Sequence, residues 1–228
     1  MSENRGPLLI DGEPYEGYWA KADDGAPLVL LVHDWDGLTG YEEKRAEMLN
    51  NMGYNVFAVD LFGQGVRPTR VEDKRQHTGE LYKDRDKLRR LMSAGLDKAG
   101  KLGGNLDNTV VMGYCFGGAA VLEAARAGMN ARGFVTFHGG LKTPDGQNYS
   151  QTKSPVLILH GTADSAISMN DFAKLAEELE AYNVPHEMIT YSGAPHAFTV
   201  WDTNRYRKDA DDKSWQAFSN FLAVNTQK

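Results

Sequence analysis

Short runs of consecutive apolar residues, separated by stretches with helical spacing, constrain the fold of this chain more than any other feature. The clear runs are 28–32, 55–60, 109–113 and 156–160, and weaker ones are 132–137 and 187–191. Helical spacing occupies 41–52, 81–102, 116–127, 170–182 and 214–224. Continuous apolar runs are typical of strands covered on both faces. The alternation predicts an α/β fold with a mainly parallel sheet, helices on both faces and a ligand site beyond the carboxyl ends of the strands.

The remaining segments refine this prediction. Residues 8–19 are interrupted by Asp11-Gly12-Glu13-Pro14 and predict a hairpin at the edge of the sheet. Residues 62–78 show neither an apolar run typical of a strand nor helical spacing. We therefore expect an irregular stretch that supplies a pocket wall or a lid. Without a repeat, a linker or a low-complexity tract, residues 1–228 are expected to form one domain.

Composition excludes several classes of protein. The formal net charge of -6 argues against a nucleic-acid partner, and no window is apolar for long enough to span a membrane. The basic run Arg67, Arg70, Lys74 and Arg75 is local and is expected to be a solvated loop. A single cysteine cannot form an internal disulfide, and the start Met1-Ser2-Glu3-Asn4-Arg5 lacks the apolar core of a secretory signal, so a cytoplasmic location is expected. No oligomeric state is predicted.

The segment 113–118, Gly113-Tyr114-Cys115-Phe116-Gly117-Gly118, lies between a predicted strand and a predicted helix. This is the pattern of a nucleophile elbow with cysteine in the place of serine, where flanking glycines let the helix and the neighbouring strands approach closely. The turn would project the Cys115 sulfur above the sheet at a helix amino terminus, which favours a thiolate. The alternative is a buried cysteine that only packs between glycines.

An elbow nucleophile needs a base and an orienting acid, which in this fold follow it in the order acid, then base. Asp164 lies directly after the strand 156–160, whereas Asp171 resembles an acidic residue at a helix amino terminus. His196 follows the last strand, in a loop that contains glycine and proline. We therefore predict Cys115 as nucleophile, Asp164 as the orienting acid and His196 as general base.

The oxyanion hole needs two NH donors. One is expected from Phe116, which follows the nucleophile, and the other from Trp35 in the loop after the strand 28–32. Asp34 and Asp36 in that loop could be either solvated or functional. Of the other histidines, His33 and His160 are expected to make structural hydrogen bonds at strand ends, and His77 and His186 lie in polar surroundings. Neither a metal nor a cofactor is expected, since no pair of residues has ligand spacing.

Five motifs together resemble those of the dienelactone hydrolase family, and the likeness covers nearly the whole chain. They are His33-Asp34-Trp35-Asp36-Gly37, Ala58-Val59-Asp60-Leu61-Phe62-Gly63, the segment 113–118, His160-Gly161-Thr162-Ala163-Asp164 and His196-Ala197-Phe198. The resemblance implies an α/β-hydrolase fold without a large cap domain, with Cys115, Asp164 and His196 at the family's triad positions. It also implies that Asp34 takes the place of a glutamate whose carboxylate contacts the resting cysteine.

The substrate prediction rests on a departure from the family. Members that open carboxylated dienelactones hold the substrate carboxylate with arginines, one of them a few residues beyond the catalytic histidine. Here no arginine lies between His196 and Arg205. The second arginine position falls near Arg75 to His77. We therefore predict small neutral esters or lactones as substrates, with the carboxylated dienelactone as the alternative. The expected cleft is aromatic, with substrate contacts from Asp34, Phe62, His138, Phe198 and Trp201.

The predicted reaction is attack of the Cys115 thiolate on an ester or lactone carbonyl, through a thioester acyl-enzyme. Activated phosphate triesters could be a side activity, because the same NH pair can hold a phosphoryl oxygen. A glutamine amidotransferase or related glyoxalase type of enzyme is disfavoured by the order Cys115, Asp164, His196. A catalytically silent binding protein on the same fold is the other alternative.

Overall fold

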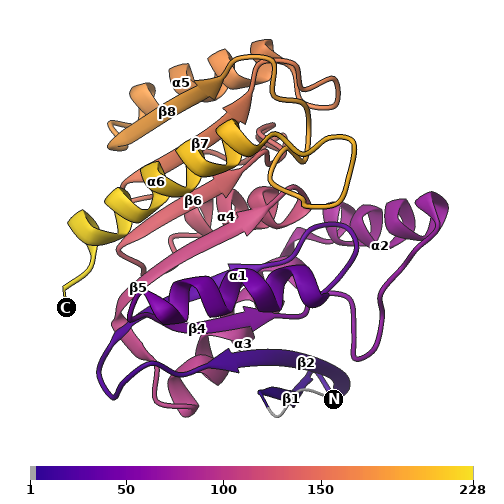
Figure 1. The fold of residues 1–228 in the computed structure, drawn as a ribbon, viewed down its shortest axis with the longest axis vertical. Helices are drawn as coiled ribbons and strands as arrows, with labels where there is room; N and C mark the ends of the chain where they lie inside the picture. Colours follow the sequence, from indigo (N-terminus) through magenta and orange to yellow (C-terminus); the bar gives the residue numbers. More distant parts are fainter. Residues whose placement is uncertain (1–3, 228) are drawn as a thin grey trace.

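Strands form where the apolar runs lie, which confirms the predicted sheet (Figure 1). The structure is a computed structural model and describes residues 4–227. The parallel strands are β3 (Pro27–Val32), β4 (Asn55–Val59), β5 (Asn105–Tyr114), β6 (Gly133–Phe137), β7 (Val156–Gly161) and β8 (His186–Tyr191). The predicted hairpin is β1 (Arg5–Ile10) and β2 (Glu13–Ala20); β2 pairs antiparallel with β4, and β1 pairs antiparallel with β2 at the edge of the sheet. The strand order is β1-β2-β4-β3-β5-β6-β7-β8.

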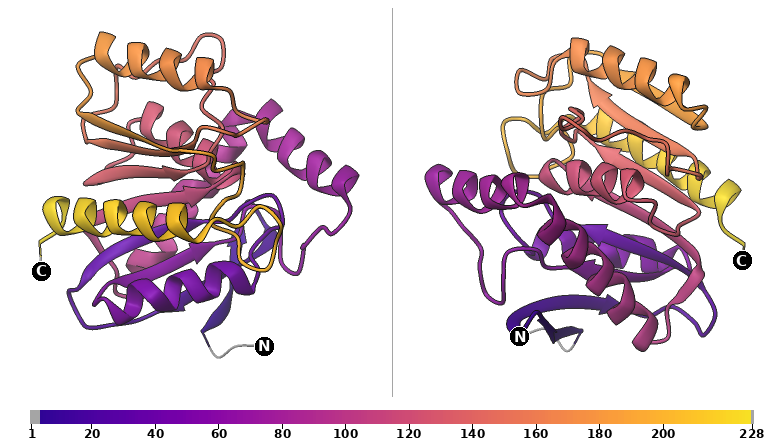
Figure 2. Two further views of the ribbon diagram at one scale, coloured as in Figure 1. Left: turned by 45° about the horizontal axis from the view of Figure 1, so that its top comes forward. Right: turned by 180° about the vertical axis from the view of Figure 1, so that it is seen from behind.

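Helices cover both faces of the sheet (Figures 1 and 2). One face carries α1 (Gly40–Asn51) and α6 (Lys208–Asn225), and the other carries α3 (Arg85–Lys101), α4 (Phe116–Arg126) and α5 (Met169–Ala181). Alternate residues of β3 therefore enter different cores. Leu31 packs in the cluster that contains Phe218 of α6, and Leu30 packs in the one that contains Leu91 of α3. Each fully buried aliphatic side chain contributes about 1.5–3 kcal/mol, which explains why the strands are apolar on both faces.

The segment between β4 and α3 differs from its prediction. Residues 71–83 form a helix, α2 (Val71–Lys83), so the expected irregular stretch ends well before Thr78. The single helix expected over 81–102 is two helices that meet at Asp84, whose side chain accepts a hydrogen bond from the Lys87 NH at 2.9 Å. In Figures 1 and 2, α2 extends past the carboxyl ends of the strands, where the ligand site is expected.

No helix within residues 4–227 combines the length and the apolar character needed to cross a membrane. The stretch 1–5, considered above for a secretory signal, lies in part outside the described residues. No cap domain is present in the described part of the chain.

Candidate active site

Cys115 occupies a strained turn between β5 and α4. Its backbone has φ 54° and ψ -114°, a region that costs a non-glycine residue about 1–3 kcal/mol. The turn closes because Gly117 lies directly against the carbonyl oxygens of Val32 and His33, where a Cβ would not fit. Phe116 is the first residue of α4, so its NH is among those that no carbonyl of the helix accepts. The turn therefore presents a thiol beside a free NH donor at a helix amino terminus.

Three side chains from three loops meet at this turn. The Cys115 sulfur lies 3.0 Å from Nε2 of His196, and Nδ1 of the same imidazole lies 2.8 Å from Oδ2 of Asp164. The imidazole thus contacts a thiol on one side and a carboxylate on the other. Asp171 is 7 residues further along, in the first turn of α5, where its backbone NH donates to Oγ of the capping residue Ser168 at 3.1 Å.

Asp164 is held by its own loop in a single orientation. Its Oδ1 accepts hydrogen bonds from the NH groups of Ala166 at 2.9 Å and Ile167 at 2.8 Å, which leaves Oδ2 for the imidazole. Burial opposes the charged form, but the hydrogen bonds from His196 and from the two NH groups outweigh it and lower the pKa of Asp164. His160 fixes the far end of the loop, since its Nε2 lies 3.1 Å from the Ile167 carbonyl oxygen. This confirms a structural hydrogen bond for His160.

The surroundings of His196 favour its protonated form. Burial alone would lower its pKa, but the hydrogen bonds to Asp164 and Cys115, together with their negative charges, raise the pKa of His196 to about 10. A protonated imidazole next to a sulfur is the partner that stabilises a thiolate in reactive cysteines. The site therefore places the Cys115 sulfur in contact with an imidazole whose protonated form is favoured.

The loop that carries His196 is anchored from the other face of the sheet. Thr199 Oγ1 lies 2.8 Å from Nε2 of His138, and the Thr199 carbonyl oxygen accepts a hydrogen bond from the Arg45 guanidinium at 2.9 Å. Arg45 is itself buried and paired with Asp211 at 2.6 Å. Because Thr199 is close to His196 in the chain, this buried pair fixes the position of the imidazole.

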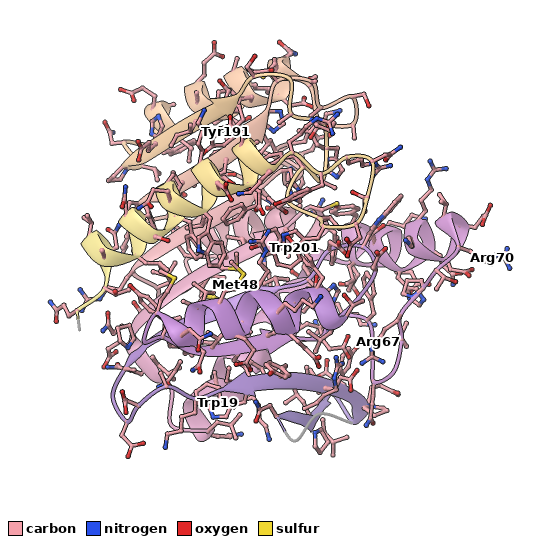
Figure 3. The ribbon with its side chains drawn as sticks, in the orientation of Figure 1. Trp19, Met48, Arg67, Arg70, Tyr191 and Trp201 are labelled. Atoms are coloured by element: carbon pink, nitrogen blue, oxygen red, sulfur yellow. The ribbon has the colours of Figure 1, made fainter. Side chains whose placement is uncertain are left out.

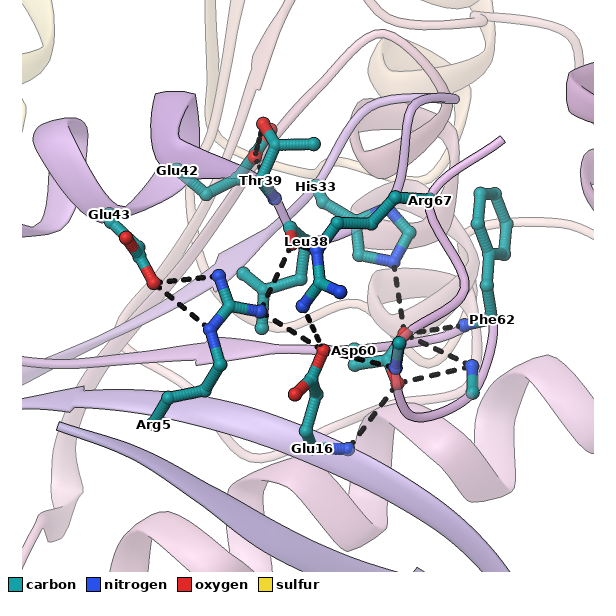
Figure 4. A network of polar contacts seen from close by, with 12 residues as sticks. Arg5, Glu16, His33, Leu38, Thr39, Glu42, Glu43, Asp60, Phe62 and Arg67 are labelled. Atoms are coloured by element: carbon teal, nitrogen blue, oxygen red, sulfur yellow. Dashed lines mark hydrogen bonds and ion pairs between the residues drawn. The ribbon is translucent and has the colours of Figure 1, made fainter. Parts of the chain in front are cut away.

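The loops after β3 and β4 are joined by a network of polar contacts (Figure 4). His33 Nδ1 donates to the Asp34 carbonyl oxygen at 2.6 Å, and its Nε2 accepts from the Leu61 NH at 3.0 Å. Burial lowers the pKa of His33 to about 4, so this neutral tautomer persists. Arg67 crosses from the loop after β4 to Glu16 and to the Leu38 carbonyl oxygen. His33 thus has the structural role predicted for it.

Asp34 and Asp36 have different surroundings. Asp34 is buried, and its Oδ1 accepts a hydrogen bond from the Asp36 NH at 2.7 Å. Burial, and next the charge of Asp36, raise the pKa of Asp34 to about 7. Asp36 forms an ion pair with Lys74 of α2, whose ammonium also lies 5.3 Å from the centre of the Trp35 ring. The hydrogen bonds of residues 4–227 include none between Asp34 and Cys115.

Lys74 therefore ties α2 to the loop after β3, and α2 becomes one wall of a cleft. The cavity, of about 390 Å³, is lined by the cysteine and histidine together with residues from α2 and from the loops after β3, β7 and β8. Its lining includes Trp35, Arg75, Tyr82, Cys115, Phe116, His196 and Arg205. The expectation that residues 62–78 supply a pocket wall holds for their helical part, which includes Arg75 and Thr78. The basic run is not a solvated loop, because Lys74 and Arg75 lie in α2 and because Arg67 and Lys74 form ion pairs with Glu16 and Asp36.

None of the five expected substrate contacts is among the residues that line the cleft: Asp34 is buried in the loop after β3, and the other four lie elsewhere. Phe62 lies behind Phe116, with ring centres 5.5 Å apart, and His138 and Phe198 are fully buried beneath the imidazole. Trp201 covers the Arg45 guanidinium at 4.0 Å and borders a separate groove that includes Met48 of α1; both are labelled in Figure 3. None of the four lines the cleft. Position just after a strand does not determine which way a side chain points, so the predicted aromatic cleft is wrong for them.

The cleft also contains cations, although an aromatic cleft for neutral substrates was expected. Arg75 and Arg205 both line it. Arg205 reaches the cleft because residues 197–207 return toward the site, where the Arg207 NH donates to the Phe198 carbonyl oxygen at 3.0 Å. The absence of an arginine directly after His196 therefore does not leave the cleft without a cation. The second arginine position implied by the family resemblance falls near Arg75, whereas no local signal placed Arg205 or Tyr82 in the cleft.

Comparisons with known proteins agree with this architecture. The family description "Dienelactone hydrolase family" matches residues 15–225. A Salmonella typhimurium protein whose assigned name is carboxymethylenebutenolidase is 25% identical over 93% of this chain and 83% of its own length. The solved structure "m3DLH" has a TM-score of 0.90 and 25% identity, covering 98% of both chains. A dienelactone hydrolase-like promiscuous phosphotriesterase, P91, from metagenomic libraries, has a TM-score of 0.88 and 24% identity, again covering 98% of both chains.

Proposed function

The chain belongs to the dienelactone hydrolase family and is a hydrolase of esters or lactones, and from this premise we propose that it works through a thioester on Cys115. His196 is the proton carrier in this proposal and Asp164 the acid that orients it. The observation that carries the proposal is the pair of contacts made by His196, 3.0 Å to sulfur and 2.8 Å to a carboxylate oxygen, at a strained elbow. We also propose that residues 1–228 form a single domain.

The first half of the reaction forms the thioester. The Cys115 thiolate attacks the carbonyl carbon, and the carbonyl electron pair moves to oxygen, where the NH groups of Phe116 and Trp35 stabilise the negative charge. The oxyanion then collapses and the carbon–oxygen bond to the leaving alcohol breaks. His196 gives its Nε2 proton to the departing alkoxide, and the imidazole becomes neutral.

The second half uses the imidazole as a base. Thioester formation removes the negative charge on sulfur, which is one of the causes that raise the pKa of His196. The pKa of His196 is therefore lower in the acyl-enzyme, so the imidazole is neutral more of the time and available to accept a proton. It takes a proton from water, the hydroxide attacks the thioester, and the carbon–sulfur bond breaks. The carboxylic acid leaves, and the thiolate and imidazolium are restored.

Two substrate classes fit this chemistry, and the cleft lining favours one. Small neutral esters can contact the aromatic surface of Trp35 and Phe116. An ester or lactone that carries a carboxylate can also pair with Arg75 and Arg205, and charge-assisted hydrogen bonds are about twice as strong as neutral ones. We therefore propose a carboxylated ester or lactone as the better substrate, with neutral esters turned over more slowly.

A comparison of substrates tests this choice. The value of kcat/KM should be higher for a carboxylated lactone than for a neutral aryl ester of similar size. Arg75→Met and Arg205→Met should reduce this preference, whereas Arg132→Met, far from the cleft, should not. Equal values for both substrates in the original protein would contradict the anionic preference. Absence of any ester turnover would contradict the hydrolase mechanism and leave the silent binding protein.

Activated, uncharged phosphate triesters form a second candidate substrate class. The structural neighbour named a promiscuous phosphotriesterase supports it, as does an NH pair that can hold a phosphoryl oxygen. Slow release of para-nitrophenol from a diethyl aryl phosphate, absent in Cys115→Ser, is the expected result. Equal release by the Cys115→Ser protein would reject Cys115 as the nucleophile for this activity.

A further inference from the structure

A second cavity adjoins the cleft. It has a volume of about 250 Å³ and shares Tyr82, Gly140, Ala166 and Ile167 with the lining of the cleft. An added Cβ at Gly140 would lie 3.8 Å from the Tyr82 hydroxyl, so these two residues form the narrow connection between the cavities. We call the second cavity the side pocket.

The far part of the side pocket is lined by cations. Arg85, Arg126 and Lys142 contribute to it, and Asp171 is its one acidic lining residue. The Arg126 side chain is only 2% exposed and is held in place by a hydrogen bond to the Tyr149 hydroxyl at 3.0 Å. A buried and fixed guanidinium in a cavity wall is a prepared partner for an anion.

These cations exceed the acids that neutralise them. Glu123 is fully buried and accepts from Arg126 at 2.8 Å, from Arg89 at 2.8 Å and from Arg85 at 3.2 Å. One carboxylate thus serves three guanidinium groups. Burial lowers the pKa of Arg85, and the positive charge of Arg126 lowers it further, although the Glu123 carboxylate opposes this shift. An anion that entered the side pocket would relieve this excess of positive charge.

The chemistry at Cys115 decides which part of a substrate faces the side pocket. The leaving alcohol must receive a proton from His196, so it lies on the side of the cleft that contains His196 and Arg205. The acyl arm then lies toward Phe116 and Tyr82, at the entrance of the side pocket. Ala119 and Leu141 are apolar wall residues there and suit the methylene groups of such an arm.

We propose that the side pocket binds an anionic group at the end of the substrate's acyl arm, so that the enzyme selects acyl chains that end in a carboxylate. This inference rests on the proposed hydrolysis at Cys115 and adds a specificity site formed by Arg85, Arg126 and Lys142. It is separate from Arg75 and Arg205, which line the cleft itself.

The test compares matched esters. The para-nitrophenyl monoesters of adipic and suberic acid are measured against para-nitrophenyl hexanoate and octanoate, which have the same chain lengths and end in methyl groups. The ratio of kcat/KM for the charged over the neutral ester should exceed one and should depend on chain length. Lys142→Met and Arg85→Met should each lower this ratio roughly fivefold to tenfold, as expected for loss of one charge-assisted contact. Lys174→Met, a matched change on the exposed part of α5, should leave the ratio unchanged.

Binding of free adipate provides a readout that does not depend on turnover. Calorimetric titration of Cys115→Ser should give tighter binding than the same titration of Cys115→Ser/Lys142→Met. The inference would be overturned if the ratio of kcat/KM for the charged over the neutral ester did not change with chain length, or if Lys142→Met and Arg85→Met left it unchanged. Hydrolysis of these esters would in that case still support the proposed function. If no ester is hydrolysed, the adipate titrations still test the side pocket. Equal affinity in Cys115→Ser and Cys115→Ser/Lys142→Met would then reject anion binding there.

Discussion

Replacement of Asp164 by asparagine changes one atom and should disable the site for a definite geometric reason. Oδ1 of Asp164 accepts hydrogen bonds from two backbone NH groups, so the asparagine must keep its carbonyl oxygen at that position. Its NH2 group then faces Nδ1 of His196, where the Asp164 oxygen now lies 2.8 Å away. The NH2 group can only donate there, which requires Nδ1 without a proton and leaves the neutral imidazole with its proton on Nε2. That tautomer cannot accept a proton from water.

The size of the effect follows from this wrong tautomer. Asp164→Asn should lower kcat by about three to four orders of magnitude, which is the cost of the same tautomer error in a Ser-His-Asp site. This corresponds to roughly 4–5.5 kcal/mol in the activation free energy. The fold should survive, because asparagine has nearly the same volume and keeps the two backbone contacts.

Asp171→Asn is the matched control, since the hydrogen bond of Asp171 is to Ser168 and not to His196 or Cys115. Both variants are assayed with para-nitrophenyl acetate, whose acyl group is too short to reach the side pocket that Asp171 lines, with thermal unfolding measured in parallel. Asp171→Asn should retain nearly full activity. A loss smaller than tenfold for Asp164→Asn, or a crippled Asp171→Asn protein, would refute the assignment of the orienting acid.

Three further predictions follow from the described contacts. Asp211→Asn removes the charge that pairs with buried Arg45 and should lower the free energy of unfolding, measured by urea titration, by about 3–5 kcal/mol. Asp209→Asn, which removes one partner of an exposed ion pair, should lower it by about 0.5 kcal/mol or less. Equal losses in the two variants would contradict the role of burial. The NMR-measured pKa of His196 should fall in Cys115→Ser, and an unchanged value would contradict the thiolate contact. Because protonated His196 serves the leaving alcohol, kcat/KM for an alkyl ester should fall as pH rises through about 10, and less so for a para-nitrophenyl ester; identical profiles would reject this proton transfer.

The fold was largely predictable because buried parallel strands leave a strong signal. The runs at β3 and β5 are apolar on both faces, and the strand, turn and helix around Cys115 need glycines that the sequence displays. The helix α2 was missed for the opposite reason. Only Thr78 and Leu81 of its 13 residues are buried, so its sequence has almost no apolar periodicity.

The site was predictable where a residue's role depends on its place after a strand, and not where it depends on side-chain direction. Cys115, Asp164 and His196 meet because parallel strands bring their carboxyl ends to one edge. Phe198 also follows a strand, but it points into the core next to Ala197, which has a left-handed backbone with φ 61°. Arg205 comes back to the site through the packing of a loop, which no local pattern in the sequence records.

Alkylation of Cys115 tests the central claim most directly, because it is the only cysteine of the chain. The protein is titrated with iodoacetamide, the modified fraction is measured by intact mass spectrometry, and the remaining ester turnover is measured on the same samples. Activity should fall in proportion to the modified fraction and reach zero at one carbamidomethyl group per chain. Full turnover by stoichiometrically alkylated protein would contradict Cys115 as the nucleophile.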